Sequence, residues 1–220
     1  MRVLRFWAVE LKAQVFKLVK ELHSKCSGRE TLSVRVRPWA PNNKGLRVGI
    51  EIERKFLVDG EAFRNSEEWR HHIVSMTSMY QGYFSSPETL ESGQKASMRV
   101  RLEYPSAEEK NSISWLNIKS VGRGHTRQEF EYQIPTDEAE QLLQLCVGSV
   151  VSKVRYCVNY GGHLWEVDCF TNDNDGLWVA EIELTSADFP ITLPSWVGAE
   201  VTDDLRYTNV ALSAHPFSGW

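Results

Sequence analysis

The sequence predicts an α+β protein in which antiparallel strands close into an eight-stranded β-barrel with flanking helices. The first supporting observation is a repeated alternation of polar and apolar residues at period two, which is typical of half-buried antiparallel strands. The second is the spacing of these segments, which are separated by turn residues or by short helical patterns. The third is their number, because about eight strands can close a barrel around one small ligand.

The predicted strands follow one another from residue 50 to about residue 185. The first contains Ile50-Glu51-Ile52-Glu53-Arg54-Lys55-Phe56 and ends before Asp59-Gly60. The others are expected at about 79–85, 96–104, 113–121, 126–134, 150–160, 163–171 and 177–185. Gly161-Gly162 and Asn172-Asp173-Asn174-Asp175-Gly176 are expected to form the turns between the last three.

Three helices are expected to flank the barrel. The first runs from Glu61 to about Met76 and presents Phe63, Trp69 and Ile73. The second begins at Thr136, which is a favourable N-cap residue followed by first-turn acids. The third is expected to be capped by Thr202 and to continue through Leu205, Val210 and Leu212.

Most predicted strands carry two charges of the same sign, two positions apart. Residues at this spacing share one face of a strand, so each strand has a charged face and an apolar face. The pairs are Glu51/Glu53, Arg99/Arg101, Glu129/Glu131, Lys153/Arg155, Glu166/Asp168 and Glu181/Glu183, with Lys119 alone on its strand. One interpretation turns these faces to water, with opposite charges paired across neighbouring strands.

A second interpretation places the charged faces inside the barrel. Such an interior needs neutralising charge, namely divalent cations beside the acidic strands and a polyanion beside the basic strands. Carboxylates that hold Mg²⁺ or Mn²⁺, together with Arg and Lys that hold phosphoryl oxygens, form the two parts of a phosphoryl-transfer site. The repetition of same-sign pairs favours this interpretation.

Glu51-Ile52-Glu53-Arg54-Lys55 resembles the ExExK signature of the CYTH family, also called triphosphate tunnel metalloenzymes. Further segments follow in the family's order over about residues 48 to 217. They are Gln81-Gly82-Tyr83, Arg99-Val100-Arg101, Leu116-Asn117-Ile118-Lys119, 126–132, Trp165-Glu166-Val167-Asp168, Ala180-Glu181-Ile182-Glu183-Leu184 and 200–209. The resemblance to compact bacterial members implies an inorganic triphosphatase.

The resemblance, together with the charge pattern, assigns roles to individual residues. The substrate-binding candidates are Lys55, Arg99, Arg101, Lys119, Lys153 and Arg155. The candidate ligands for Mg²⁺ or Mn²⁺ are Glu51, Glu53, Asp168, Glu181 and Glu183. The resemblance also implies Tyr83 as a catalytic base, although a tyrosine at the tunnel mouth that hydrogen-bonds a phosphate fits this position equally well.

Composition and charge indicate where the protein is located and which kinds of partner it can bind. The cysteines Cys26, Cys146, Cys157 and Cys169 have no metal-binding or disulfide spacing, so a reducing, cytoplasmic location is expected. The sequence contains no apolar run long enough for a transmembrane helix. Residues 1–47 carry 11 basic and three acidic residues, or +8, which leaves −4 − 8 = −12 on residues 48–220. This negative charge argues against nucleic acid as a partner.

The chain is expected to divide at this change in charge. Residues 1–47 read as a basic extension and linker, with an amphipathic helical pattern up to about His23, and residues 48–220 as the tunnel domain. The extension could dock on the barrel as a structural helix, lie on an anionic membrane surface or be extra sequence outside the functional domain. We expect it to have no part in catalysis.

Alternative functions remain at this stage. Related barrels act on organic triphosphates, as in thiamine triphosphate hydrolysis or the adenylate cyclase reaction. A non-catalytic polyphosphate-binding module is the non-enzymatic alternative, although pure anion binding would gain nothing from the acidic strands. The sequence is also compatible with a homodimer.

Overall fold

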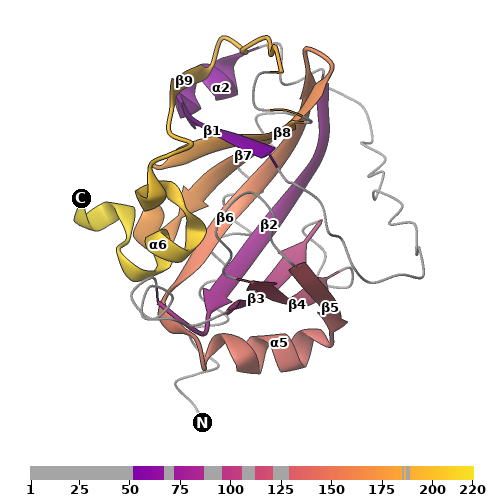
Figure 1. The fold of residues 1–220 in the computed structure, drawn as a ribbon, viewed down its shortest axis with the longest axis vertical. Coiled ribbons are helices and arrows are strands. Elements are labelled where there is room, and N and C mark those ends of the chain that lie inside the picture. Colours follow the sequence, from indigo (N-terminus) through magenta and orange to yellow (C-terminus); the bar gives the residue numbers. More distant parts are fainter. Residues whose placement is uncertain are drawn as a thin grey trace.

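The computed structural model describes residues 52–66, 72–86, 96–105, 112–120, 129–184, 186 and 189–220 (Figure 1). Within these ranges one antiparallel sheet has the strand order β5-β4-β3-β2-β6-β7-β8-β1-β9. The strands are β1 (Ile52–Val58), β2 (Ile73–Tyr83), β3 (Ala96–Tyr104), β4 (Ile113–Ser120), β5 (Glu129–Ile134), β6 (Val147–Tyr160), β7 (His163–Thr171), β8 (Trp178–Leu184) and β9 (Val197–Glu200). The α-helices are α2 (Gly60–Asn65), α5 (Thr136–Leu143) and α6 (Asn209–Ala214), and the 3₁₀ turns are η2 (Asn172–Asn174), η3 (Leu205–Tyr207) and η4 (Phe217–Gly219).

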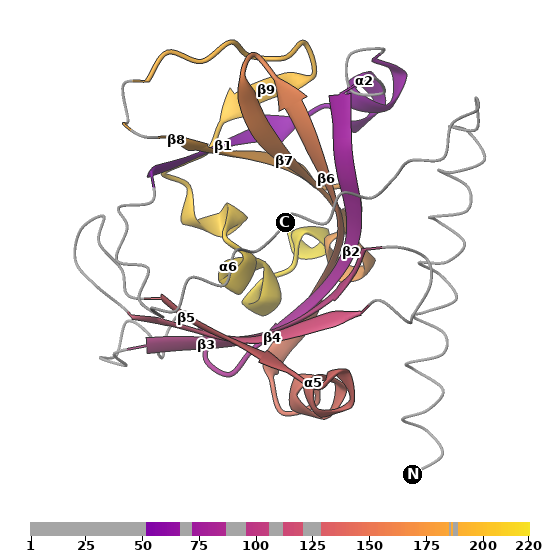
Figure 2. The same ribbon diagram turned by 90° about the vertical axis from the view of Figure 1, so that its right-hand side faces the viewer.

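The sheet is open, so the prediction of a closed eight-stranded barrel is wrong. Strands β5 and β9 are its two edges and do not pair with each other. The second side of β1 is occupied by β9, a short strand that the alternation pattern did not indicate, with Phe56 opposite Glu200 and Val58 opposite Val197. Because β1 already has a partner on each side, it cannot close the sheet onto β5. The sheet instead curves strongly around α6 (Figure 2).

The convex face of the sheet carries the largest part of the core. Phe63 of α2 is buried and packs edge-on against Trp196, with ring centroids 5.0 Å apart, and against Trp178 at 5.6 Å. Even-numbered residues of β6 and odd-numbered residues of β7, such as Val158 and Trp165, complete this cluster. Burial of these rings supplies the apolar driving force that fixes the convex face.

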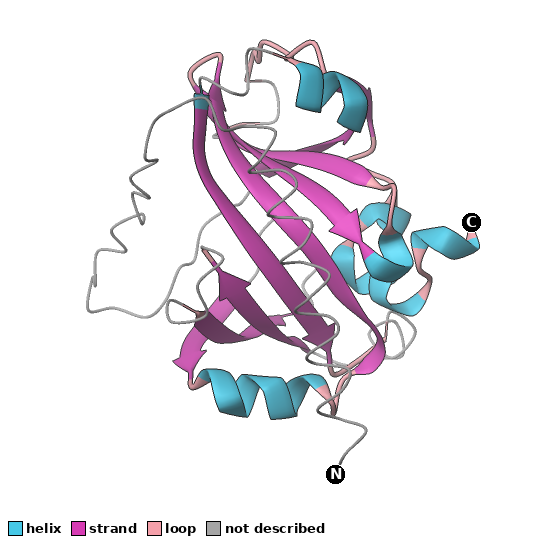
Figure 3. Cartoon of the chain, turned by 180° about the vertical axis from the view of Figure 1, so that it is seen from behind, coloured by secondary structure: helices cyan, strands magenta, loops and turns pink. Residues whose placement is uncertain are grey.

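A second helix covers the other half of the convex face. Helix α5 lies along the lower edge of the molecule (Figures 1 and 3), where Ala139 packs with Tyr80, Val100 and Leu102. The predicted start of this helix at Thr136 is confirmed, but Pro135 occupies the N-cap position and makes no side-chain cap. The hydroxyl of Thr136 instead accepts a hydrogen bond from Ser114 of β4 at 3.1 Å.

The concave face is covered by α6. Leu212 of this helix is fully buried against Val151, Phe170 and Val179 of the sheet and against Leu177, which immediately precedes β8. These sheet residues lie at one end of the same face that carries the charged pairs. The concave face is therefore apolar beneath α6 and charged beyond it.

Two helix predictions are wrong in their bounds. The helix expected over 61–76 ends at Asn65, and the chain is already in β2 by Ile73, where Ser75 and Thr77 pair with Cys157 and Arg155 of β6. Pairing with the long strand β6 outweighs the helical spacing of the apolar residues. Residues 67–71 lie outside the described ranges.

The final helix begins later than expected. Thr202 does not cap it, because the Thr202 hydroxyl accepts a hydrogen bond from the backbone N–H of Lys55 at 3.0 Å. Helix α6 instead begins after Thr208, whose hydroxyl accepts from the backbone N–H of Ala211. The predicted Gly161-Gly162 turn is confirmed, since both glycines have positive φ (58° and 81°) between the paired residues Tyr160 and His163.

Candidate active site

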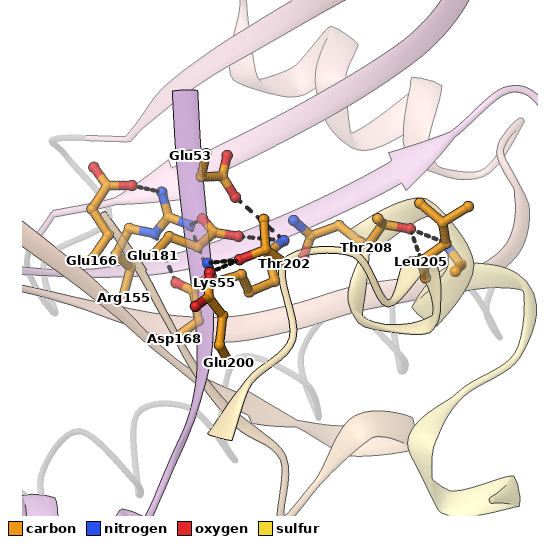
Figure 4. Close-up of polar contacts among 12 residues, drawn as sticks. Glu53, Lys55, Arg155, Glu166, Asp168, Glu181, Glu200, Thr202, Leu205 and Thr208 are labelled. Atoms are coloured by element: carbon orange, nitrogen blue, oxygen red, sulfur yellow. Dashed lines mark hydrogen bonds and ion pairs between the residues drawn. The ribbon is translucent and has the colours of Figure 1, made fainter. Parts of the chain in front are cut away.

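Four neighbouring strands, β6, β7, β8 and β1, bring opposite charges together on the concave face (Figure 4). The register places Arg155 opposite Asp168, while Glu181 lies opposite Glu166 on one side and opposite Lys55 on the other. Because these are cross-strand neighbours, each carboxylate is within reach of a basic group. The same-sign pairs of the sequence thus become an alternating network in the folded chain.

Arg155 is the centre of this network. Its guanidinium donates to both oxygens of Asp168 at 2.7 Å each, to Glu181 Oε2 at 2.9 Å, and also to Glu166. Burial alone would lower the pKa of Arg155, but the charge and hydrogen bonds of Asp168 raise it well above its ordinary value. Arg155 is therefore a permanent cation held in a fixed orientation.

Lys153 lies next to Arg155 and deeper in the fold. Its side chain is only 2% exposed, and its ammonium donates to Asp168 and, at 3.4 Å, to Asn209 Oδ1 of α6. Burial lowers the pKa of Lys153, and the negative charge of Asp168 offsets part of this shift. Asp168, 1% exposed, is consequently shared between the buried Lys153 and the partly buried Arg155.

Lys55 and two glutamates complete the network on β1 and β8. The Lys55 ammonium lies 2.8 Å from Glu181 Oε1 and 3.4 Å from Glu53 Oε1. Burial would raise the pKa of Glu181, but Arg155 and Lys55 hold it well below its ordinary range. In contrast, partial burial and the charge of Glu181 raise the pKa of Glu53 despite the opposing effect of Lys55. Glu53 and Glu181 are therefore two neighbouring carboxylates whose negative charges repel each other. We call them the crowded carboxylates.

The opposite wall of the concave face is basic and comes from β2, β3 and β4. Arg99 lies opposite Tyr83 on one side and Asn117 on the other. Arg101 lies 2.7 Å from Glu103 Oε1 and 3.7 Å from Glu131 Oε1. Burial, together with the charge of Arg99, lowers the pKa of Arg101.

Tyr83, the predicted base, lies on this wall. Its side chain is buried, and burial raises its pKa although Arg99 favours the phenolate. A neutral phenol is a hydrogen-bond donor, so its surroundings favour the phosphate-contacting role over proton abstraction. The role of Tyr83 in catalysis stays a prediction.

The described members of the predicted set all lie on strands that carry the concave face. Lys119 lies at the outer end of β4 opposite Ser97, and Glu183 lies opposite Glu53 on β8. Glu51 and the side chain of Glu129 lie outside the described residues. Sequence reasoning missed Asn209, because nothing in its spacing indicates contact with Lys153. It also gave no role to Gln81, although this residue is two positions before Tyr83 and thus on the same face.

The donor chemistry of this site fits a divalent cation of the Mg²⁺ or Mn²⁺ type. Glu53 and Glu181 are hard oxygen donors. Burial and the charge of Glu181 raise the pKa of Glu53, and a bound cation would relieve both effects. Glu183 is the next carboxylate beside Glu53. Among the described residues no group of three or more His, Cys, Asp or Glu side chains is already arranged as a metal site. Asp168 fits less well as a ligand, because Lys153 and Arg155 already engage its oxygens.

A protein whose curved sheet carries arginines, lysines and carboxylates on its concave face is suited to binding phosphorylated anions and divalent cations. The chain belongs to the CYTH family, since the CYTH domain model matches residues 49–211.

Two curated relatives have the same name. An inorganic triphosphatase of Acetivibrio thermocellus is 35% identical over 174 residues, which cover 79% of this chain and 99% of that protein. An inorganic triphosphatase of Nitrosomonas europaea is 35% identical over 170 residues, covering 74% of this chain and 96% of that protein. A crystal structure of an inorganic triphosphatase superimposes with a TM-score of 0.51 at 31% identity, over 74% of this chain and 93% of that chain. None of the described helices is both long and apolar enough to cross a membrane.

Proposed function

We propose that this protein hydrolyses inorganic tripolyphosphate to pyrophosphate and phosphate on the concave face of its sheet, with Mg²⁺ or Mn²⁺ as cofactor. The observation that carries the proposal is the largely buried network of Lys55, Arg155, Asp168 and Glu181, in which cations and carboxylates alternate across four strands. The named relatives, both inorganic triphosphatases, support the same substrate class.

The basic residues would bind the triphosphate. Arg99 and Arg101 on one wall and Lys55, Lys153 and Arg155 on the other face a common concave surface, with Lys119 at the outer end of β4. Arginine suits bidentate contact with phosphoryl oxygens, whereas lysine acts as a point charge. An elongated polyanion can therefore contact both walls at once.

The acidic residues would have two different tasks. Glu53, Glu181 and Glu183, together with Glu51, are the proposed cation ligands, and a bound cation would neutralise charge on the phosphoryl oxygens and lower the pKa of water. Asp168 would instead hold Lys153 and Arg155 in place, because both donate to it. Tyr83, kept neutral by burial, would donate a hydrogen bond to a phosphoryl oxygen.

The glutamates of this site also favour a catalytic function over a module that only binds polyphosphate. A site for a polyanion alone would be weakened by glutamates next to its cations, since like charges repel. A catalytic site that takes up a cation with its substrate gains from them. The free thiols of Cys146 and Cys169 support a reducing, cytoplasmic location.

The proposal is tested with two substitutions at neighbouring positions of β1. Lys55→Met removes a cation from the network, and we expect kcat/KM for tripolyphosphate to fall by roughly a hundredfold or more, as is usual for loss of a charge that stabilises a transition state. Arg54→Met is the matched control, because Arg54 pairs with the exposed Glu200 instead of the network. Equal activity of the two variants would contradict the proposed site.

A further inference from the structure

The wall formed by β2, β3 and β4 contains several buried donor atoms without a hydrogen-bond partner among the described residues. They are Gln81 Nε2, Arg99 Nε and Trp115 Nε1. An unsatisfied buried donor costs free energy, and most buried polar groups are paired, so each such group needs an explanation. Several of them on adjacent strands point to a common cause.

The strand register places these donors on one face of the sheet. Gln81 of β2 lies opposite Arg101 of β3, and Arg101 lies opposite Trp115 of β4, so the three form a single row across the strands. Arg99 occupies the next position of this face along β3. Gln81 is 1% exposed, so water does not satisfy its amide.

The chemistry of the row differs from that of the opposite wall. Arg155, Lys153 and Lys55 have their donors engaged by carboxylates, whereas the amide of Gln81 and the indole of Trp115 are neutral donors with nothing to donate to. A phosphoryl group offers several acceptor oxygens and matches a mixture of guanidinium, amide and indole N–H groups.

We propose that Gln81 and Trp115 complete a phosphoryl subsite with Arg99 and Arg101, in which neutral N–H donors bind one end of the triphosphate. This inference rests on the proposed function and extends it. The subsite lies on β2, β3 and β4, whereas the crowded carboxylates lie on β1 and β8. Its neutral donors hold a phosphoryl group from the β2–β4 wall, and Gln81 orients the substrate on the concave face.

Gln81→Met is the most informative test, because methionine has a similar length and no donor. We expect calorimetric titration with tripolyphosphate in EDTA to show roughly ten- to a hundredfold weaker binding, the usual loss for a hydrogen bond to a charged group. The ligand-free variant should unfold at the same or a higher temperature than the wild type, since the substitution removes an unsatisfied donor. A residue with a merely structural role would lower the unfolding temperature instead.

Two further variants complete the experiment. Trp115→Phe removes the second neutral donor and should also weaken binding. Gln133→Met is the matched control, because Gln133 lies opposite Trp115 at the edge of the sheet and is exposed, and it should bind as the wild type does. Wild-type affinity in Gln81→Met, or weak binding together with a lower unfolding temperature, would overturn the inference. A wild type that neither binds nor hydrolyses tripolyphosphate would instead overturn the proposed function.

Discussion

Asp168 illustrates how single residues hold the site together. It is almost completely buried and accepts hydrogen bonds from both Lys153 and Arg155. A buried ion network of this kind is weak evidence for net stability, but loss of one member leaves uncompensated charge in the interior. The geometry of the two cations therefore depends on this one carboxylate.

The first prediction concerns Asp168→Asn. Because Lys153 is left buried without its carboxylate, we expect the free energy of unfolding to fall by about 3–5 kcal/mol, measured by urea denaturation. Glu166→Gln is the matched control on the same strand. Glu166 also contacts Arg155, but its side chain is 30% exposed, so a much smaller loss is expected. Equal losses in the two variants would show that burial does not control the energetics of this network.

The second prediction concerns pH. Because Arg155 and Lys55 hold the pKa of Glu181 far below its ordinary value of 4.5, the unfolded chain binds more protons there than the native chain. The stabilisation is complete above that ordinary value and is lost as pH falls below it. Glu181→Gln should be less stable than the wild type at neutral pH and should lose less stability on acidification to about pH 3. Parallel acid-induced losses in thermal unfolding would contradict this.

The strand faces that carry the candidate site residues were predicted from the sequence, but the partners of these residues were not. The period-two spacing of Lys153/Arg155 and Glu181/Glu183 identified the charged faces because alternation along a strand is a local property. The pairing of Arg155 with Asp168 depends on strand register, which the spacing does not contain. The contact of Asn209 with Lys153 depends on where α6 packs, and that is a property of the whole fold.

At the scale of elements, α6 connects the apolar core to the site. Leu212 fixes the helix on the concave face, and Asn209 at its first turn reaches Lys153. The position of this helix was not predicted correctly, because the Thr202 hydroxyl accepts a hydrogen bond from Lys55 of β1 and Thr208 caps the helix instead. Similarly, the β2 segment was assigned partly to a helix, since apolar spacing alone could not reveal its pairing with β6.

The third prediction tests this connection. Leu212 is fully buried, so Leu212→Ala should reduce the free energy of unfolding by about 2–5 kcal/mol. It should also raise KM for tripolyphosphate, because a loosened α6 no longer holds Asn209 against Lys153. Leu205→Ala is the control in the same segment, since Leu205 is 73% exposed. An unchanged KM in folded Leu212→Ala protein would show that α6 is independent of the site.

At the scale of the whole molecule, the sheet is a curved open surface. Alternation identified all strands except β9, whose sequence Val197-Gly198-Ala199-Glu200 has no clear period. Closure could not be predicted, because it depends on which strand takes the free side of β1. An open sheet still gathers its charged residues on one face. The prediction that these residues share a face therefore did not depend on closure of the sheet into a barrel.

The fourth prediction concerns residues 1–47, which lie outside the described residues. Their charge of +8 contrasts with −12 on residues 48–220, and every site residue proposed above lies in the latter. We expect a protein of residues 48–220 to keep kcat/KM for tripolyphosphate within about threefold of the full chain, a difference below 1 kcal/mol. A folded but inactive shortened protein would make the N-terminal segment part of the catalytic machinery.

The most direct measurement is phosphate release from tripolyphosphate, ATP and thiamine triphosphate in parallel, with Mg²⁺, Mn²⁺ or EDTA. Our account predicts rapid release from tripolyphosphate with either cation, pyrophosphate as the second product, little release from the organic triphosphates, and no turnover in EDTA. Preference for ATP or thiamine triphosphate, or undiminished turnover in EDTA, would contradict it.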